Sequence, residues 1–164
     1  MKRESLIAAF SAICALTFAA SAHAASKEFI QASSAGEKTE FYWTKPEGAG
    51  PFPVLFFIHP HQESPRPGGA VFVENGQLDY WKRKGYLSVA VSQPGFGEST
   101  GVPDFCGPRT QQAVIDAIRH FQAIAEVDSQ RIFMYGGSRG AVVAAMVAAS
   151  GISFRLLRTW ARVL

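Results

Sequence analysis

Residues 136–140 read GGSRG and place Ser138 between two glycines. An apolar run at 132–135 precedes them, and small apolar residues at 141–149 follow. This order predicts a buried strand, a tight turn and a helix. A serine on such a turn is exposed and held in a strained backbone conformation, which suits a nucleophile. Because glycine-x-serine-x-glycine also occurs in ordinary glycine turns, the flanking strand and helix are what favour this interpretation.

The expected turn would also contribute to the chemistry around Ser138. The following helix would direct its first N–H groups and the positive end of its dipole at the site. The backbone N–H of Arg139 would then donate to the oxyanion that forms when a serine attacks a carbonyl group.

Two further apolar runs, at 54–58 and 87–91, are continuous rather than alternating. Such runs are typical of strands buried on both faces, as in a parallel sheet. His59 directly follows the first run, and the glycine-rich segment 92–101 follows the second. Ligand sites of open α/β sheets gather at the carboxyl ends of strands, so we expect both features near Ser138.

The other elements complete an α/β pattern. Residues 40–44 predict a strand, and 76–84 a weak helix. Residues 110–126 predict a stronger helix, because their apolar residues recur at spacings of three and four, with Thr110 as a possible N-cap. Alternating strands and helices predict an α/β fold.

Three segments in this order, PEGAGPFPVLFFIHP, GYLSVAVSQPGFGESTG and RIFMYGGSRGA, resemble the α/β-hydrolase superfamily. The likeness is greatest to prolyl-oligopeptidase-like serine peptidases and dienelactone-hydrolase-like esterases. It covers residues 37–150 and implies the N-terminal part of an α/β-hydrolase fold, a mostly parallel sheet with flanking helices that ends after the helix following Ser138. It further implies that Ser138 forms an acyl-enzyme with a peptide or ester substrate, without a cofactor or metal.

The resemblance also implies a second oxyanion donor in the loop after FFIH. Members of the superfamily usually have glycine after this histidine, whereas Pro60 stands here and has no N–H. The donor would then be the N–H of His61 or Gln62. His59 would orient the loop.

In this fold the catalytic acid and then the histidine follow the serine along the chain. Residues 139–164 contain no Asp, Glu or His. A serine without a base is a weak nucleophile, so only His59, His61 or His120 could substitute. An active hydrolase and a catalytically inactive, truncated fragment both remain open. A chain ending here would also leave the strand before Ser138 as an unpaired edge.

Residues 151–164 form an atypical basic tail. At helical spacing Arg155, Arg158 and Arg162 share one side, which predicts an amphipathic helix able to contact an anionic membrane. Alternatively, the tail results from a frameshift or premature stop after Ser150, which we favour, or from an incomplete gene model.

The chain begins with a cationic start, an apolar stretch at 6–20 and Ala22-His23-Ala24. This pattern predicts a signal peptide, 1–24, cleaved near Ala24, and hence a secreted or periplasmic protein. An N-terminal membrane anchor is the alternative. Residues 25–36 predict a loose segment before the hydrolase domain.

The remaining composition indicates few other functions. A net charge of +3 does not suggest a nucleic-acid partner. Cys106 is the one cysteine after the signal peptide, so no internal disulfide is expected. His59 and His61 lack further ligands for a convincing metal set. Glu63 and Glu98 either line the cleft or are exposed loop charges, and the sequence does not indicate an oligomeric state.

Overall fold

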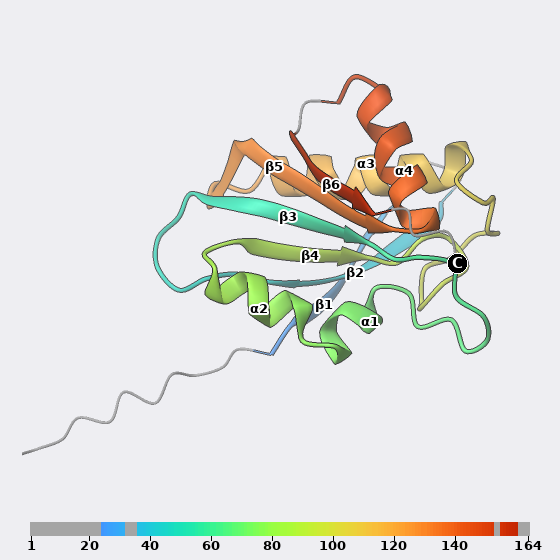
Figure 1. The fold of residues 1–164 in the computed structure, drawn as a ribbon, viewed down its shortest axis with the longest axis horizontal. Coiled ribbons are helices and arrows are strands. Elements are labelled where there is room, and N and C mark those ends of the chain that lie inside the picture. Colours follow the sequence, from blue (N-terminus) through green and yellow to red (C-terminus); the bar gives the residue numbers. More distant parts are fainter. Residues whose placement is uncertain (1–23, 32–35, 153–154, 161–164) are drawn as a thin grey trace, which may run out of the picture.

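A computed structural model describes residues 24–31, 36–152 and 155–160. They form one six-stranded sheet with helices on both faces (Figure 1). The strands are β1 (Ser26–Gln31), β2 (Lys38–Thr44), β3 (Phe52–Ile58), β4 (Leu87–Val91), β5 (Val127–Gly137) and β6 (Arg155–Trp160). The helices are α1 (Ala70–Glu74), α2 (Gln77–Arg83), α3 (Pro108–Gln122) and α4 (Arg139–Ala149).

The sheet has the strand order β1-β2-β4-β3-β5-β6. Strands β4, β3, β5 and β6 are parallel, whereas β1 and β2 run antiparallel to their neighbours. Ile58 pairs with Val91 on one side and with Gly136 on the other. The carboxyl ends of β3, β4 and β5 therefore meet at one edge of the sheet. A mostly parallel sheet with flanking helices, as the sequence predicts, is confirmed.

Strand β3 shows why its sequence is continuously apolar. Residues 54–58 are all buried, and alternate side chains pack on opposite faces of the sheet. Val54, Phe56 and Ile58 join the core that α3 and α4 cover. Leu55 and Phe57 join the smaller core under α1 and α2 (Figure 1). A strand covered on both faces has no solvent side that would favour polar residues.

Helix α3 begins two residues before the predicted start, so the prediction that Thr110 is its N-cap is wrong. Gly107 occupies the cap position and has no capping side chain. The carboxylate of Asp104 instead accepts hydrogen bonds from the backbone N–H groups of Arg109, at 2.7 Å, and Thr110, at 3.2 Å. Pro108 lies in the first turn, where its missing N–H has no cost.

Two predictions near the ends of the described chain are wrong. Residues 26–31, expected to be loose, form β1 because their backbone pairs with β2 from Ser26 to Gln31. Residues 155–160, expected to be helical, form β6, which pairs in parallel with Phe133–Gly137 of β5. Strand β5 is therefore not an unpaired edge. The predicted membrane contact relied on an amphipathic helix, and residues 155–160 do not form one. Arg162 lies outside the described residues.

No helix in the described part of the chain combines the length and the apolar character that a membrane span requires.

Candidate active site

Ser138 lies on the turn between β5 and α4. Its backbone has φ +50° and ψ −122°, a conformation that residues with a side chain rarely adopt. Such strain costs about 1–3 kcal/mol and persists where the surrounding structure imposes it, most often at functional sites. Ser138 is also exposed to solvent. The turn thus presents the hydroxyl at the carboxyl edge of the sheet.

The two glycines flanking Ser138 have a steric role. A Cβ on Gly136 would lie 2.3 Å from the carbonyl oxygen of Gly140, across the turn. A Cβ on Gly140 would lie 2.1 Å from the carbonyl oxygen of Ile58, at the end of β3. Neither clash can be relieved by rotating a side chain, because the contacted atoms belong to the backbone. The glycine-x-serine-x-glycine spacing is therefore a packing requirement of this turn.

His59, directly after β3, is completely buried. Its Nε2 accepts a hydrogen bond from the backbone N–H of Gln93 at 3.1 Å, and its Nδ1 lies 2.8 Å from the Pro60 carbonyl oxygen. This pattern requires a neutral ring with its proton on Nδ1. Burial lowers the pKa of His59 from the ordinary 6.5 to about 4. His59 is therefore a structural residue that holds the loop, with no ring nitrogen available to Ser138.

His61 follows on the same loop and is exposed. Its Nδ1 lies 3.0 Å from Nη1 of Arg139, and its Nε2 lies 3.3 Å from Oε1 of Glu63. The structure thus brings together the side chains of Arg139 and His61, the two residues whose backbone N–H groups the sequence predicts as oxyanion donors. Gln62 is the alternative source through its backbone N–H. Its side chain donates to the Gly68 carbonyl oxygen and accepts from the Gly68 N–H.

Arg139, the residue after Ser138, points its side chain across the neighbouring loops. Its Nη2 donates to Oε1 of Gln93 at 3.2 Å. Its guanidinium lies 4.7 Å from the ring centre of Phe96 and 5.7 Å from that of Phe105. Burial lowers the pKa of Arg139. Sequence reasoning missed Gln93, Phe96 and Phe105, and the glycine-rich loop that holds Gln93 and Phe96 was the one available signal.

Glu40 of β2 anchors that glycine-rich loop and was also missed. It is completely buried, and it accepts hydrogen bonds from Oγ of Ser92 at 2.6 Å and from the N–H of Glu98 at 3.1 Å. The Lys27 ammonium, 3.1 Å away, balances its charge. Glu98 itself is exposed and also pairs with Lys27. Of the two sequence interpretations of Glu98, an exposed loop charge is the one observed.

Cys106 is buried beneath the turn. Its Sγ lies 3.7 Å from the carbonyl oxygen of Arg139, and burial raises the pKa of the thiol. Both features indicate packing rather than a reactive thiolate. The described residues contain no group of three or more His, Cys, Asp or Glu side chains that could hold a metal ion.

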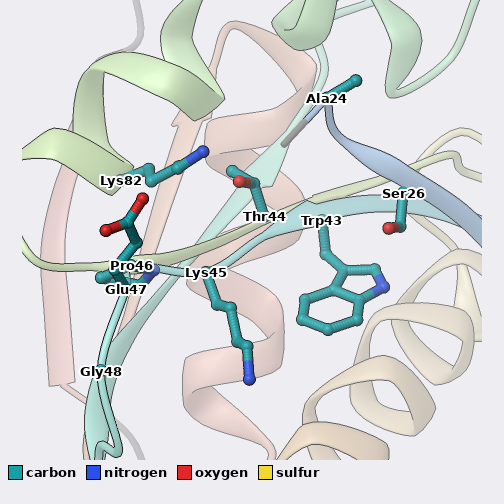
Figure 2. Close-up of a pocket in the computed structure, with 9 residues that line it drawn as sticks. All are labelled: Ala24, Ser26, Trp43, Thr44, Lys45, Pro46, Glu47, Gly48 and Lys82. Atoms are coloured by element: carbon teal, nitrogen blue, oxygen red, sulfur yellow. The ribbon is translucent and has the colours of Figure 1, made fainter. Parts of the chain in front are cut away.

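A pocket of about 270 Å³ lies away from Ser138. Figure 2 shows Trp43, Lys45, Glu47 and Lys82 around it. Thr44, another lining residue, pairs with Ser88 near the start of β4. The pocket therefore lies near the amino ends of the parallel strands, whereas the Ser138 turn lies at their carboxyl ends.

Comparison with solved structures finds the same fold in larger chains. The α/β hydrolase GrgF from Penicillium sp. sh18 is 16% identical with a TM-score of 0.64, over 76% of this chain and 41% of that one. A Vigna radiata epoxide hydrolase mutant is 18% identical with a TM-score of 0.62, over 83% and 37%. The Pyrococcus furiosus esterase Pf2001 is 16% identical with a TM-score of 0.58, over 74% and 46%.

At these identities the structural likeness shows the fold alone, and the chain spans less than half of each of these three proteins. Comparison with curated proteins finds no match. Comparison with protein families finds one that is described as X-Pro dipeptidyl-peptidase (S15 family), over residues 38–153. These residues run from β2 past the end of α4 and include Ser138. The chain therefore belongs to the X-Pro dipeptidyl-peptidase S15 family, within the α/β-hydrolase superfamily.

Proposed function

We propose that this chain carries the nucleophile of an exported serine hydrolase that cleaves a peptide or ester bond. Oγ of Ser138 attacks the carbonyl carbon, and the departing amine or alcohol takes up a proton as the acyl-enzyme forms. Water then releases the acid and restores the hydroxyl. The supporting observation is the positive φ of Ser138 between β5 and α4, on a turn whose two glycines at 136 and 140 have no room for a Cβ.

Two backbone N–H groups would stabilise the negative charge on the carbonyl oxygen. The N–H of Arg139 is the first of α4, where the helix leaves it without an intrahelical acceptor. The N–H of His61 would be the second, because Pro60 cannot donate. Removing one such donor from a serine hydrolase lowers turnover by about 10²–10³-fold.

The proton of Ser138 has no evident acceptor among the described histidines. Both ring nitrogens of His59 are engaged. His120 lies on α3, where its ring contacts Phe41 and Phe121. His61 directs Nδ1 at Arg139 and Nε2 at Glu63. The lack of a described proton acceptor supports slow acylation of Ser138 by the chain alone. It also supports a second candidate function, a catalytically inactive hydrolase domain.

The family description favours a peptide substrate with proline in the second position, and the esterase with the same fold keeps an ester as the alternative. Hydrolysis of Gly-Pro-4-nitroanilide and of 4-nitrophenyl acetate should be compared in the wild type and in Ser138→Ala. A Ser138-dependent rate on the anilide would support the peptidase, and a Ser138-dependent rate on the acetate alone would support the esterase. Equal rates in both proteins would contradict the hydrolase proposal.

Export is proposed on the leader pattern of residues 1–24. The mature protein, recovered from the periplasm or culture medium, should begin at Ala25 when its N-terminus is sequenced. An intact Met1 on protein confined to the cytoplasm would contradict export.

A further inference from the structure

We infer that the Arg139 side chain is a positioning residue, which fixes the loop after β3 so that the N–H of His61 can meet the oxyanion. The inference rests on the proposed function. It assigns Arg139 two separate tasks, with its backbone N–H as one oxyanion donor and its guanidinium as the group that holds the other donor's loop.

The first step is the contact between Arg139 and His61. Their Nη1 and Nδ1 atoms are 3.0 Å apart. A guanidinium only donates hydrogen bonds, so Nδ1 of His61 is the unprotonated, accepting nitrogen. The ring proton then lies on Nε2, which faces the Glu63 carboxylate at 3.3 Å. Both ring nitrogens thus have partners that suit one orientation of the imidazole.

The second step is the set of hydrogen bonds by which Gln93 connects Arg139 to His59. Its Oε1 accepts from Nη2 of Arg139 at 3.2 Å, while its Nε2 donates to the His59 carbonyl oxygen at 2.7 Å. Its backbone N–H donates to Nε2 of His59. The two Nη atoms of Arg139 therefore bind the loops after β3 and β4 at once. A planar guanidinium suits this task, because its donors have a fixed relative geometry.

The third step concerns why this loop needs such support. In the absence of an N–H at position 60, the donor moves one residue further from the buried end of β3. His59 is completely buried, whereas His61 is exposed. Fixing the backbone of an exposed loop residue in one conformation costs conformational entropy. The Arg139 contact and the Gln62 side-chain bonds to Gly68 restrain the chain at and just beyond this residue.

The guanidinium is itself held in place. It packs against the rings of Phe96 and Phe105, which favour a cation over their faces. No carboxylate within salt-bridge distance of it occurs among residues 24–31 and 36–152, and its partners there are the neutral acceptors of His61 and Gln93. The contacts thus fit positioning by hydrogen-bond geometry rather than neutralisation of a charge.

Backbone amide relaxation, measured by NMR on the full chain, tests the loop directly and independently of catalysis. Arg139→Gln should lower the order parameters of the His61 and Gln62 amides from about 0.85, typical of rigid backbone, to below about 0.6, because the loop loses its hydrogen bond to the guanidinium. Arg66→Gln is the matched control. Arg66 also lies over the Phe96 ring, at 5.3 Å, but has no described hydrogen bond from its side chain to this loop. Unchanged order parameters in Arg139→Gln would overturn the inference.

Labelling by a fluorophosphonate tests the functional part, because the phosphoryl oxygen of the probe occupies the oxyanion position. Arg139→Gln should lower the maximal labelling rate by roughly ten- to a hundredfold, with little change in the probe concentration at half-saturation. Arg139→Lys keeps the positive charge but lacks the two Nη donors that bind His61 and Gln93 together, so it should not restore the rate. Full restoration by lysine, or an unaltered rate in Arg139→Gln with a loosened loop, would overturn the positioning role. If the wild type takes no label, the proposed function fails, and the relaxation result alone decides whether Arg139 orders the loop.

Discussion

Gly140 and Ile58 are in backbone contact, so close that a Cβ on Gly140 would lie 2.1 Å from the Ile58 carbonyl oxygen. The same Cβ would lie 2.8 Å from the carbonyl oxygen of His59. Helix α4 therefore begins directly against the end of β3. This contact sets the separation between the Ser138 turn and the loop that carries His61.

Replacing Gly140 by alanine should destabilise the protein by about 2–3 kcal/mol, because α4 must move away from β3. The strain outweighs the gain of about 1 kcal/mol that alanine brings to a helix. Urea unfolding followed by circular dichroism measures the change.

Gly137→Ala is the matched control on the same turn. A Cβ there would meet nothing within 4 Å, so the free energy of unfolding should change by less than about 1 kcal/mol. Equal losses in the two variants would show that the Ile58 contact is not what requires glycine at position 140.

The strands and the turn were predictable because burial leaves a direct mark on sequence. Residues 87–91 form β4 with the predicted bounds, as a run buried on both faces. The structure of residues 155–160 was mispredicted because strand pairing leaves no such mark on the sequence. The arginine spacing fits a helix, but β5 offers N–H and C=O groups that need partners, and residues 155–160 supply them. A short isolated helix has little stability to set against such pairing.

Glu40→Gln should destabilise the protein by about 2 kcal/mol or more. The new amide places a donor among the donors from Ser92, Glu98 and Lys27, and it leaves Lys27 without its buried counter-charge. Thermal unfolding at pH 7 measures the loss. Since Ser92 precedes Gln93, the same variant should loosen the loop that binds Arg139.

Glu98→Gln is the control for that variant, because Glu98 pairs with the same lysine from an exposed position. Its unfolding temperature should stay close to that of the wild type, since exposed ion pairs contribute little. A loss as large as that of Glu40→Gln would indicate that removing any charge near Lys27 suffices.

His59 should make stability depend on pH between about 6.5 and 4. The unfolded chain protonates this histidine below pH 6.5, whereas burial keeps it neutral in the folded protein down to about pH 4. The unfolded state therefore binds more protons in this window, and stability falls as pH is lowered, by at most about 3 kcal/mol. Below pH 4 His59 contributes no further dependence. Urea unfolding at several pH values measures the slope.

His59→Gln, which keeps an acceptor near the Nε2 position, should flatten that slope by up to about 1.4 kcal/mol per pH unit. A wild-type slope in His59→Gln would show that other groups carry the pH dependence.

The positions of the candidate site residues along the backbone could be predicted, whereas their side-chain contacts could not. Ser138, Arg139 and His61 lie just after predicted strands, and parallel strands bring their carboxyl ends together. The hydrogen bonds among Arg139, Gln93 and His61 depend on how the loops after β3 and β4 lie against the start of α4. No local sequence pattern encodes that arrangement. Glu40 gave no signal either, because a charged residue in a strand usually indicates its solvent face.

The most direct test of the central claim is mass spectrometry of the folded chain after treatment with a fluorophosphonate. Trypsin releases residues 132–139 as a peptide in which Ser138 is the one serine. If Ser138 is the nucleophile, this peptide gains the mass of the phosphonyl group, and neither urea-unfolded protein nor Ser138→Ala gives an adduct. A folded protein with no adduct on this peptide, or with labelling spread equally over other serines, would contradict the assignment of Ser138 as an active nucleophile.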